Sequence, residues 1–369
     1  MDRNPIVQDV SQAIVKVCRS GLPLDKLRTE VLTRLTRLLP ADAVWWAAAD
    51  PATLLFTNTY RAAIPADTTA YFVENEFLHD DFNKWSELAR DREGVRSLAQ
   101  ATGGSLGRSE RYREIFQPLG LGDELRTVLR IQGTTWGLLC LHREVGRPYT
   151  RNEATWMRRL APHLAEAMRV ALLVESLDSP EHDGSPGLVV LSADDGSVIG
   201  STPAGERWVD ELSAHGDQRG PVPIEVQAVA ASLRSLRTND TASPRLRVRT
   251  RVGRWAVLHA SWMHVSGEDA IAVIIEEAMP TEVASVIMLA YGLTNQERVV
   301  TGLVSRGLST AEIAAELHIS IDTVGDHLKS VFHKTGVGSR TELVATILRQ
   351  HYLPRAKAGH PVGADGFFA

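Results

Sequence analysis

The chain has 369 residues, of which 44% are hydrophobic and 23% charged, and its formal net charge at pH 7 is −5. This length suits two or three globular domains, and the negative balance means that any contact with nucleic acid has to be local. Cys18 and Cys140 lack a metal or redox spacing, no apolar run approaches the roughly 18 residues of a membrane span, and the N-terminus has no secretory apolar core. We therefore expect a reduced, cytoplasmic protein with no metal and no membrane span.

The first 176 residues predict a mixed domain of helices and strands. Apolar spacing indicates two helices within 1–39, strands at 43–48 and 54–59, a strand pair at 126–131 and 135–142, and a closing helix along 156–172. Residues 61–125 give no clear pattern. The run ATGGSLGRS at 101–109 is interpreted as a plain loop rather than a phosphate-binding loop, because no strand precedes it and no Lys followed by Ser or Thr closes it.

This order of elements is typical of an α+β sandwich. The stretches LDKLRTEVLTRLTRLLPADAVWW at 24–46 and TVLRIQGTTWGLLCLHREVGRPYTRNEATWMRRLAPHLAEAM at 127–168 resemble a GAF sensory domain. The resemblance implies a domain that holds a small ligand or serves as a dimerising scaffold. Aromatic side chains are candidates to line a pocket for a flat apolar or aromatic ligand, although packing in the core is their commoner role. These candidates are Trp45, Trp46, Tyr71, Phe72, Phe77, Phe82 and Trp85.

Residues 186–279 predict a second α+β domain after a polar linker at 176–187. Strands are expected at 187–191, 197–200, 245–250, 255–263 and 270–276, with helices at 204–212 and 223–237. This order and the stretch LVVLSADDGSVIGSTPAGERW at 188–208 resemble a PAS domain. Arginines alternate along one strand, at Arg245, Arg247, Arg249 and Arg251. A solvated sheet edge is the favoured interpretation of these arginines, and a surface for nucleic acid or an acidic partner is the alternative.

The C-terminal region, 280–353, predicts an all-α module: a connecting helix at 278–291 and four short helices between 293 and 348, followed by a disordered tail at 354–369. Gly307 and Gly336 fall where helix ends need a left-handed residue, and Ser320 is a candidate cap of the third helix. Three of the helices begin with the spacing of a capping box: Thr294 with Glu297, Ser309 with Glu312, and Ser339 with Glu342.

The second and third of these helices are joined only by His318-Ile319-Ser320. A short turn between two short amphipathic helices predicts a helix-turn-helix, whose second helix enters the major groove of DNA. The region resembles the LuxR-type helix-turn-helix family of bacterial transcription factors. The matching residues are L-T-x-x-E at 293–297, Gly307-Leu308-Ser309, Glu312-Ile313-Ala314, Ile319-Ser320, Thr323-Val324, His327, Lys334, Gly336-Val337 and Arg340-Thr341-Glu342-Leu343-Val344.

The chain departs from this family at Gly325, where many members carry Lys or Arg. We therefore expect base readout to rest on Asp326, Lys329 and Ser330, since Asp accepts from cytosine and Lys donates to guanine. A solvated helix face is the alternative for Asp326. Six basic and six acidic residues between 293 and 350 give no basic footprint by composition. Candidates for DNA backbone contacts are Thr294, Ser309, Thr310, Thr323, His327, Lys334 and Arg340.

The sequence thus predicts a sequence-specific DNA-binding transcriptional regulator that is not an enzyme. We expect a homodimer tuned by a small ligand or partner that the N-terminal domains sense, with double-stranded DNA, a second copy and RNA polymerase as partners. Two related classes do not fit the sequence. A response regulator would need an N-terminal receiver domain, which these residues do not predict. An acyl-homoserine-lactone sensor would join a single domain directly to the helix-turn-helix, whereas a second domain is predicted between them here. The alternatives left open are an adaptor that uses the C-terminal helices as a dimer clamp, and a GAF-domain enzyme.

Overall fold

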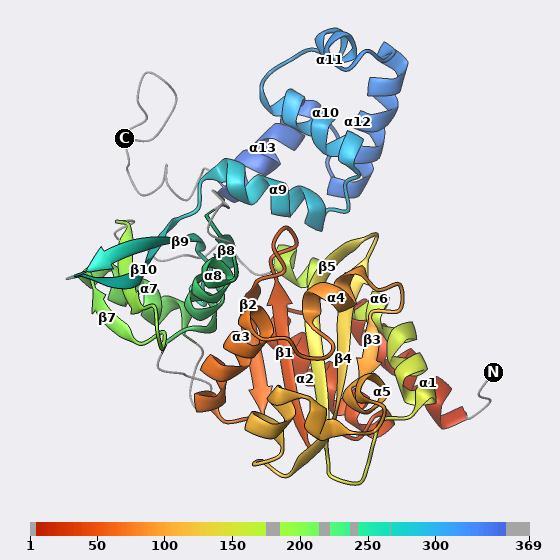
Figure 1. The fold of residues 1–369 in the computed structure, drawn as a ribbon. Coiled ribbons are helices and arrows are strands. Elements are labelled where there is room, and N and C mark those ends of the chain that lie inside the picture. The colour runs from red at the N-terminus through yellow and green to blue at the C-terminus, as the bar shows by residue number, and fades with distance from the viewer. Residues whose placement is uncertain (1–4, 175–184, 214–221, 237–242, 266, 352–369) are drawn as a thin grey trace. The chain divides into compact units, whose positions relative to one another are not determined.

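The computed structural model describes residues 5–174, 185–213, 222–236, 243–265 and 267–351. The chain divides into two compact units, one of Met1–Glu175 with Asp183–Glu277 and the other of Ser176–His182 with Ala278–Ala369, and each is described by itself. The first unit holds two antiparallel five-stranded sheets with helices around them, and the second is helical (Figure 1). The predicted α+β class is confirmed. Within the described ranges, no helix has the length and hydropathy of a transmembrane segment.

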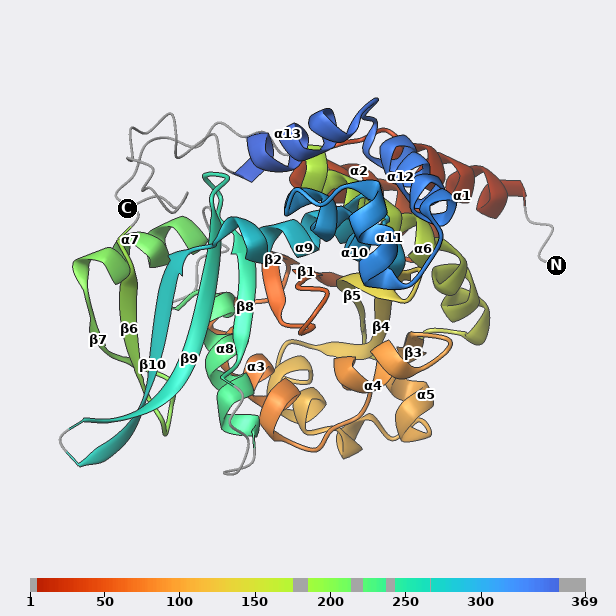
Figure 2. The same ribbon diagram turned by 90° about the horizontal axis from the view of Figure 1, so that it is seen from above.

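The first domain, residues 5–174, is a sheet between two layers of helices, with the strand order β2-β1-β5-β4-β3 (Figures 1 and 2). One layer contains α1 (Pro5–Cys18), α2 (Leu24–Leu38) and α6 (Arg151–Val174). The other contains α3 (Thr69–Leu78), α4 (Trp85–Arg90), α5 (Leu98–Thr102) and the short turns η1 (Ala66–Thr68), η2 (Leu106–Arg108) and η3 (Tyr112–Phe116). The strands are β1 (Ala43–Ala49), β2 (Phe56–Ala62), β3 (Val95–Ser97), β4 (Leu121–Ile131) and β5 (Thr134–Glu144).

Strands β4 and β5 form the central hairpin. Its turn consists of Gln132 and Gly133, both with positive φ (51° and 79°), which is the backbone that a two-residue hairpin turn requires. Strand β4 begins at Leu121, five residues before the predicted start. The extension includes Asp123 and Glu124, which are buried in spite of their charge, and buried carboxylates do not follow the apolar pattern by which strands are recognised.

The second domain, residues 185–277, has the strand order β7-β6-β10-β9-β8, which repeats the spatial order of the first sheet. Its strands are β6 (Gly187–Ser192), β7 (Val198–Ser201), β8 (Arg245–Arg249), β9 (Trp255–Val265) and β10 (Glu268–Glu277), and its helices are α7 (Pro203–Leu212) and α8 (Ile224–Ser235). Helix α7 lies so close to β6 that a Cβ atom on Gly205 would be 2.3 Å from the carbonyl oxygen of Leu188. The predicted sequence of two strands, two helices and three strands is confirmed.

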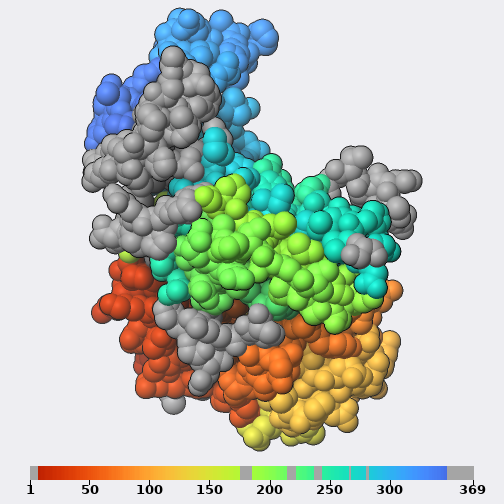
Figure 3. Space-filling model, turned by 90° about the vertical axis from the view of Figure 1, so that its left-hand side faces the viewer, coloured from red at the N-terminus to blue at the C-terminus, as the bar shows by residue number. Residues whose placement is uncertain are grey.

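The two domains of the first unit contact each other through α3 and β2 on one side and α8 and β8 on the other. Figure 3 shows the second domain, in green to teal, against the orange part of the first. Arg247 donates through Nη2 and Nε to the buried carboxylate of Asp50, at 2.7 and 2.9 Å. Glu225 accepts from the backbone N–H of Asn58 at 3.0 Å. The interpretation of the arginine row as a solvated edge is therefore wrong for Arg247, which binds the neighbouring domain.

The second unit contains five helices in its described part: α9 (Pro280–Ala290), α10 (Asn295–Ser305), α11 (Thr310–Leu317), α12 (Ile321–Thr335) and α13 (Arg340–His351). The capping boxes at Thr294 and Ser309 are confirmed, as is the cap at Ser320. At the third box the Glu342 carboxylate accepts from Gly338 N–H, one residue before Ser339. The predicted tail at 354–369 lies outside the described residues. The core consists of Leu293, Val300, Leu303, Val304, Ile313, Ala314, Val324, Leu328, Val331, Val337 and Leu343.

Candidate nucleic-acid interface and ligand pocket

The turn between α11 and α12 sets the direction of the second helix. His318 ends α11 in the left-handed region, with φ 54°, and the Ile319 N–H then donates to the Ala314 carbonyl at 3.0 Å. Ser320 caps α12 by accepting from the Thr323 N–H at 3.0 Å. Because Val324 and the rest of the apolar stripe are buried against α10 and α11, the opposite face of α12 is directed outward.

This outward face consists of Asp322, Asp326, Lys329 and His333, which are all exposed and are spaced by four, three and four residues. Such spacing places side chains in one stripe along a helix. The side chains of Lys329 and Asp326 are 80% and 77% exposed, and their charged groups lie 3.1 Å apart. An exposed pair of this kind contributes less than about 1 kcal/mol, so little free energy opposes its exchange for contacts with a base.

Ser330, the third predicted base contact, is placed differently. It is half-buried, and its hydroxyl donates to Glu297 Oε1 at 2.6 Å. Lys334, predicted to contact the DNA backbone, donates through Nζ to Oε2 and Oε1 of the same carboxylate at 2.6 and 2.9 Å. Glu297 also accepts from the Thr294 N–H at 2.7 Å, as the capping box requires. One buried carboxylate therefore connects the start of α10 to the middle and end of α12.

The pKa of Glu297 reflects these contacts. Burial alone would raise it, but the hydrogen bonds from Lys334, Ser330 and Thr294 outweigh burial and lower the pKa from 4.5 to about 2. The carboxylate is therefore charged at every physiological pH, and it holds α12 against α10. The sequence indicated Glu297 only as part of a capping box, because Lys334 lies 37 residues away and no local pattern connects the two.

The other predicted backbone contacts lie near helix starts. Thr294 and Ser309 are exposed caps of α10 and α11, and Thr323 is exposed in the first turn of α12. Free amides and positive helix dipoles at such N-termini favour phosphate. The half-buried candidates are Thr310, His327 and Arg340.

The aromatic candidates of the first domain divide between the two faces of its sheet. Trp45 contacts Phe72 and Trp85, with ring centroids 5.0 and 6.1 Å apart, and Tyr71, Phe77 and Phe82 are half-buried against the same cluster. Trp46, the next residue along β1, is on the opposite face, where its Nε1 lies 3.2 Å from Met168 Sδ of α6. Its inclusion in one pocket with the others is wrong, because successive side chains of a strand alternate between faces.

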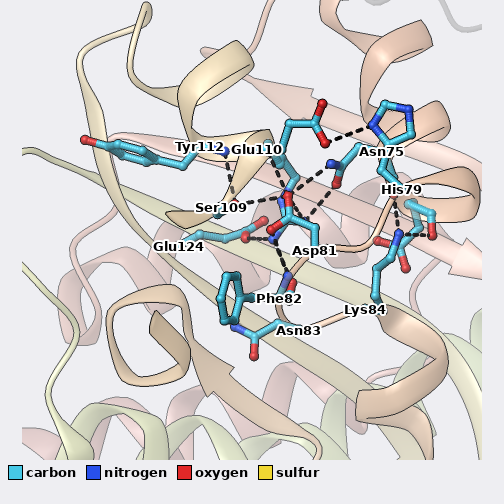
Figure 4. Close-up of polar contacts among 12 residues, drawn as sticks. Asn75, His79, Asp81, Phe82, Asn83, Lys84, Ser109, Glu110, Tyr112 and Glu124 are labelled. Carbon is cyan, nitrogen blue, oxygen red and sulfur yellow. Dashed lines mark hydrogen bonds and ion pairs between the residues drawn. The ribbon is translucent and has the colours of Figure 1, made fainter. Parts of the chain in front are cut away.

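Beside these rings lies a buried network of charged groups. Arg126 bridges Glu76 and Glu124, at 2.7 and 3.0 Å, and Arg111 reaches Glu124 at 2.8 Å. Figure 4 shows the adjoining loop, where Asp81 accepts from the side chains of Asn75 and Ser109 and from two backbone amides. Burial would raise the pKa of Asp81, but the neighbouring Arg111 and these hydrogen bonds lower it. The network joins α3, the loop before α4, η3 and β4.

Glu124, Cys140 and His142 bring three groups that can ligate metals within 4.8 Å of one another. Both carboxylate oxygens of Glu124 already accept from guanidinium groups. Burial is the main cause that raises the pKa of the Cys140 thiol well above its usual value, and the Glu124 charge raises it further. A buried neutral thiol beside two guanidinium groups is a poor cation site, and we assign no metal to it.

Comparison with known proteins places the strongest likeness in the second unit. The family model described as bacterial regulatory proteins, luxR family, matches residues 292–347. The chain is 49% identical over 53 residues to the monoamine regulon transcriptional regulator of Klebsiella aerogenes, a match that covers 14% of this chain and only 23% of that protein. It is 42% identical over 57 residues to the spore germination protein GerE of Bacillus subtilis, covering 15% of this chain and 77% of GerE. Among solved structures, SdiA of Escherichia coli aligns over 94% of this chain and 98% of its own, with 14% identity and a TM-score of 0.35.

Proposed function

We propose that this chain, which belongs to the luxR family of bacterial regulatory proteins, is a sequence-specific DNA-binding transcriptional regulator. The observation that carries the proposal is the exposed stripe of α12, held on a capped and packed helical scaffold. A helix that presents polar side chains in this way can enter the major groove and read base edges.

The residues of α12 and the caps of α10 and α11 have different proposed roles. Lys329 and Asp326 are the base-reading candidates, because both are exposed and their mutual ion pair is weak. Ser330 and Lys334 position α12 through Glu297. The exposed caps at Thr294 and Ser309 present helix N-termini to phosphates, which fix the register of the helix without specifying sequence.

We further propose that the chain has three domains, at 1–176, 186–279 and 280–353, and that two copies of it bind two half-sites as a homodimer. The first two would sense a small ligand or a partner and bias the spacing of the DNA-binding helices, and RNA polymerase is a candidate partner at the promoter. No catalytic role is proposed. An adaptor that uses the C-terminal helices only as a dimer clamp is the competing function, and the experiment below separates the two.

The test is selection from a randomised duplex pool, followed by fluorescence anisotropy on the best duplex at several salt concentrations. A dimer that neutralises about three phosphates per protomer should give a slope of log K against log salt of about −5. Lys329→Ala should broaden the selected sequence, whereas Arg306→Ala, an exposed cation at the end of α10, should leave the selected sequence unchanged. A slope near zero, or no enriched sequence, would remove the proposal and favour the clamp.

A further inference from the structure

Strand β2 is the end strand of the first sheet, and it contains a β-bulge at Asn58. In the pairing with β1, Thr57 lies opposite Ala48 and Thr59 lies opposite Ala47, so Asn58 is an extra residue on β2. Its φ is 42°, in the left-handed region that residues other than glycine seldom adopt. The extra residue of a bulge is left out of the strand pairing, which makes its backbone groups available to other partners.

The carbonyl groups of Asn58 bind Arg28 of α2. Arg28 is 1% exposed, and it donates through Nη1 to Asn58 Oδ1 at 2.6 Å and through Nη2 to the Asn58 backbone carbonyl. The carboxylate of Asp25, whose side chain is 92% exposed, lies 3.7 Å from the same guanidinium. Removal of the partners of a buried charge is strongly destabilising, so we expect Arg28 and the bulge to move together.

The backbone N–H of Asn58 binds the second domain. It donates to Oε1 of Glu225 at 3.0 Å, and Glu225, in the first turn of α8, is 4% exposed. Helix α8 packs against β2 and α3 of the first domain as well as against its own sheet (Figure 1). Because the N–H and the two carbonyl groups belong to one residue, the backbone conformation of Asn58 determines both contacts.

Other polar contacts between the two domains join one side chain to one side chain. Arg247 pairs with Asp50 at 2.7 Å, and Arg234 Nη2 lies 3.5 Å from Glu74 Oε1. Asn58 differs from them because it also bonds to α2, which lies in the opposite helical layer from α3 (Figure 2). The bulge therefore connects three elements: a helix on one face of the first sheet, the edge of that sheet, and a helix of the second domain.

We propose that Asn58 is a conformational coupling point, through which a shift of α2 changes how firmly the second domain is docked on the first. Withdrawal of Arg28 removes the hydrogen bonds that hold Asn58 in the left-handed conformation, which is unfavourable for a residue with a side chain. The backbone then relaxes, and its N–H turns away from Glu225. Coupling of this kind is reciprocal, so loss of the Glu225 contact weakens the Arg28 contact by the same factor. The inference goes beyond the proposed function, since it requires neither DNA nor a ligand.

Hydrogen exchange of the full chain, followed by mass spectrometry, tests the coupling from the first domain. Arg28→Met keeps an unbranched side chain but removes both donors to Asn58, and we expect the backbone amides of α8 to exchange about tenfold faster than in the wild type. The matched control is Arg143→Met, which removes another buried guanidinium of the first domain, paired with Glu153 at 2.6 Å. This control should leave exchange in α8 unchanged. No acceleration in α8, or equal acceleration in the two variants, would overturn the proposal.

Variants of Glu225 test the coupling in the reverse direction, and they decide the question if Arg28→Met does not fold. Glu225→Ala removes the acceptor of the Asn58 N–H and should make the backbone amides of α2 exchange about tenfold faster. Glu225→Gln keeps an acceptor, and its α2 amides should exchange no faster than those of the wild type. Unchanged exchange of α2 in Glu225→Ala, or equal acceleration in both variants, would contradict the proposal.

The double variant of Arg28→Met and Glu225→Ala distinguishes coupling through Asn58 from two independent losses. Since either substitution alone disrupts the same residue, exchange in α8 should be no faster in the double variant than in Glu225→Ala. Effects that multiply would show that the two contacts act independently, and would refute the coupling. DNA binding is measured separately. Coupled exchange in a chain that does not bind DNA refutes only the proposed function, and uncoupled exchange in a chain that binds DNA refutes only this inference.

Discussion

The two sheets of the first unit have the same strand order but different interiors. In the first domain Arg111, Arg126 and Glu124 are each 0% exposed, and both arginines donate to the Glu124 carboxylate. In the second domain the inward-facing strand residues are aliphatic, among them Val189, Leu191, Leu246, Leu258 and Val273. The same strand order occurs with buried charged residues in one domain and with aliphatic residues in the other. The strand order itself therefore does not require buried charge.

The buried charges of the first domain connect short segments to the sheet. Arg126 of β4 reaches Glu76 in α3 and the Asn83 carbonyl before α4, and Arg111 at the start of η3 reaches Asn75 and Glu124. These short elements cover one face of the sheet. Polar contacts of this kind specify one arrangement of short segments, whereas an aliphatic core tolerates several.

The largest loss of stability is expected for Arg126→Leu, which removes a charge from the interior of the first domain. Removing the guanidinium leaves Glu76 and Glu124 buried together without their shared cation, which costs about 3–5 kcal/mol. The measurement is urea denaturation of the full chain followed by tryptophan fluorescence, since Trp85 lies 4.6 Å from the Arg126 guanidinium. The matched control is Arg96→Leu on the adjacent strand, whose partner Asp91 is accessible, and it should cost less than about 1 kcal/mol. Equal losses of stability in the two variants would mean that the buried cluster stabilises the fold no more than the Arg96–Asp91 pair does.

The sequence predicts elements with local signals better than elements that depend on distant contacts. The helices of the second unit were predicted because caps such as Ser309 and Ser320 and a regular apolar stripe are local signals. Residues 61–125 gave no pattern because their elements depend on contacts such as Arg126 with Glu76, which are 50 residues apart. In the candidate sites, exposure of Asp326 and Lys329 followed from helical spacing. The Glu297–Lys334 pair depends on tertiary placement, and no spacing along the chain indicates it.

A second prediction concerns the boundary between the two sheets. Arg247→Ala should destabilise the first unit by about 3 kcal/mol, because Asp50 is 3% exposed and would lose the guanidinium with which it pairs at 2.7 Å. Arg245→Ala, two residues earlier on the same strand and exposed, should change stability by no more than about 0.5 kcal/mol. Denaturant titration of both variants compares them directly. A loss of no more than about 0.5 kcal/mol in both variants would show that the arginine row acts as a solvated edge after all.

A smaller effect is expected for Glu297→Gln in the second unit. The variant removes a charge that pairs with Lys334, and because that lysine is 30% exposed we expect a loss of only about 2 kcal/mol at pH 7. The folded pKa of about 2 lies below the ordinary 4.5, so this stability is present above pH 4.5 and is lost as the pH falls toward 2. The difference between wild type and variant should therefore shrink over that range, as measured by helical circular dichroism. A difference independent of pH would assign the cost to packing instead.

The smallest change in stability is predicted for Glu225. Unlike the variants above, removal of its charge should stabilise the first unit. It is 4% exposed at the contact between the domains and accepts one backbone hydrogen bond from Asn58, while Arg28 of the first domain reaches the Asn58 side chain instead. Burial, the largest cause, raises its pKa from 4.5 to about 7 against the opposing backbone hydrogen bonds. The folded chain therefore holds this proton more tightly than the unfolded chain does, so stability is greatest below pH 4.5 and falls as the pH rises to 7.

Glu225→Gln keeps the acceptor for the Asn58 N–H and removes the charge. At pH 8 it should stabilise the first unit by about 1–2 kcal/mol, less than the full shift of the pKa allows because water can relax around a buried charge. At pH 4.5, where wild-type Glu225 is protonated in the folded chain, the gain should largely vanish. Thermal unfolding at the two pH values measures the gain, with Glu87→Gln on the exposed surface of α4 as the control. A stabilisation of equal size at both pH values would show that amide packing, rather than the lost charge, is responsible, and a destabilisation at pH 8 would mean that the contact between the domains uses the ionised carboxylate.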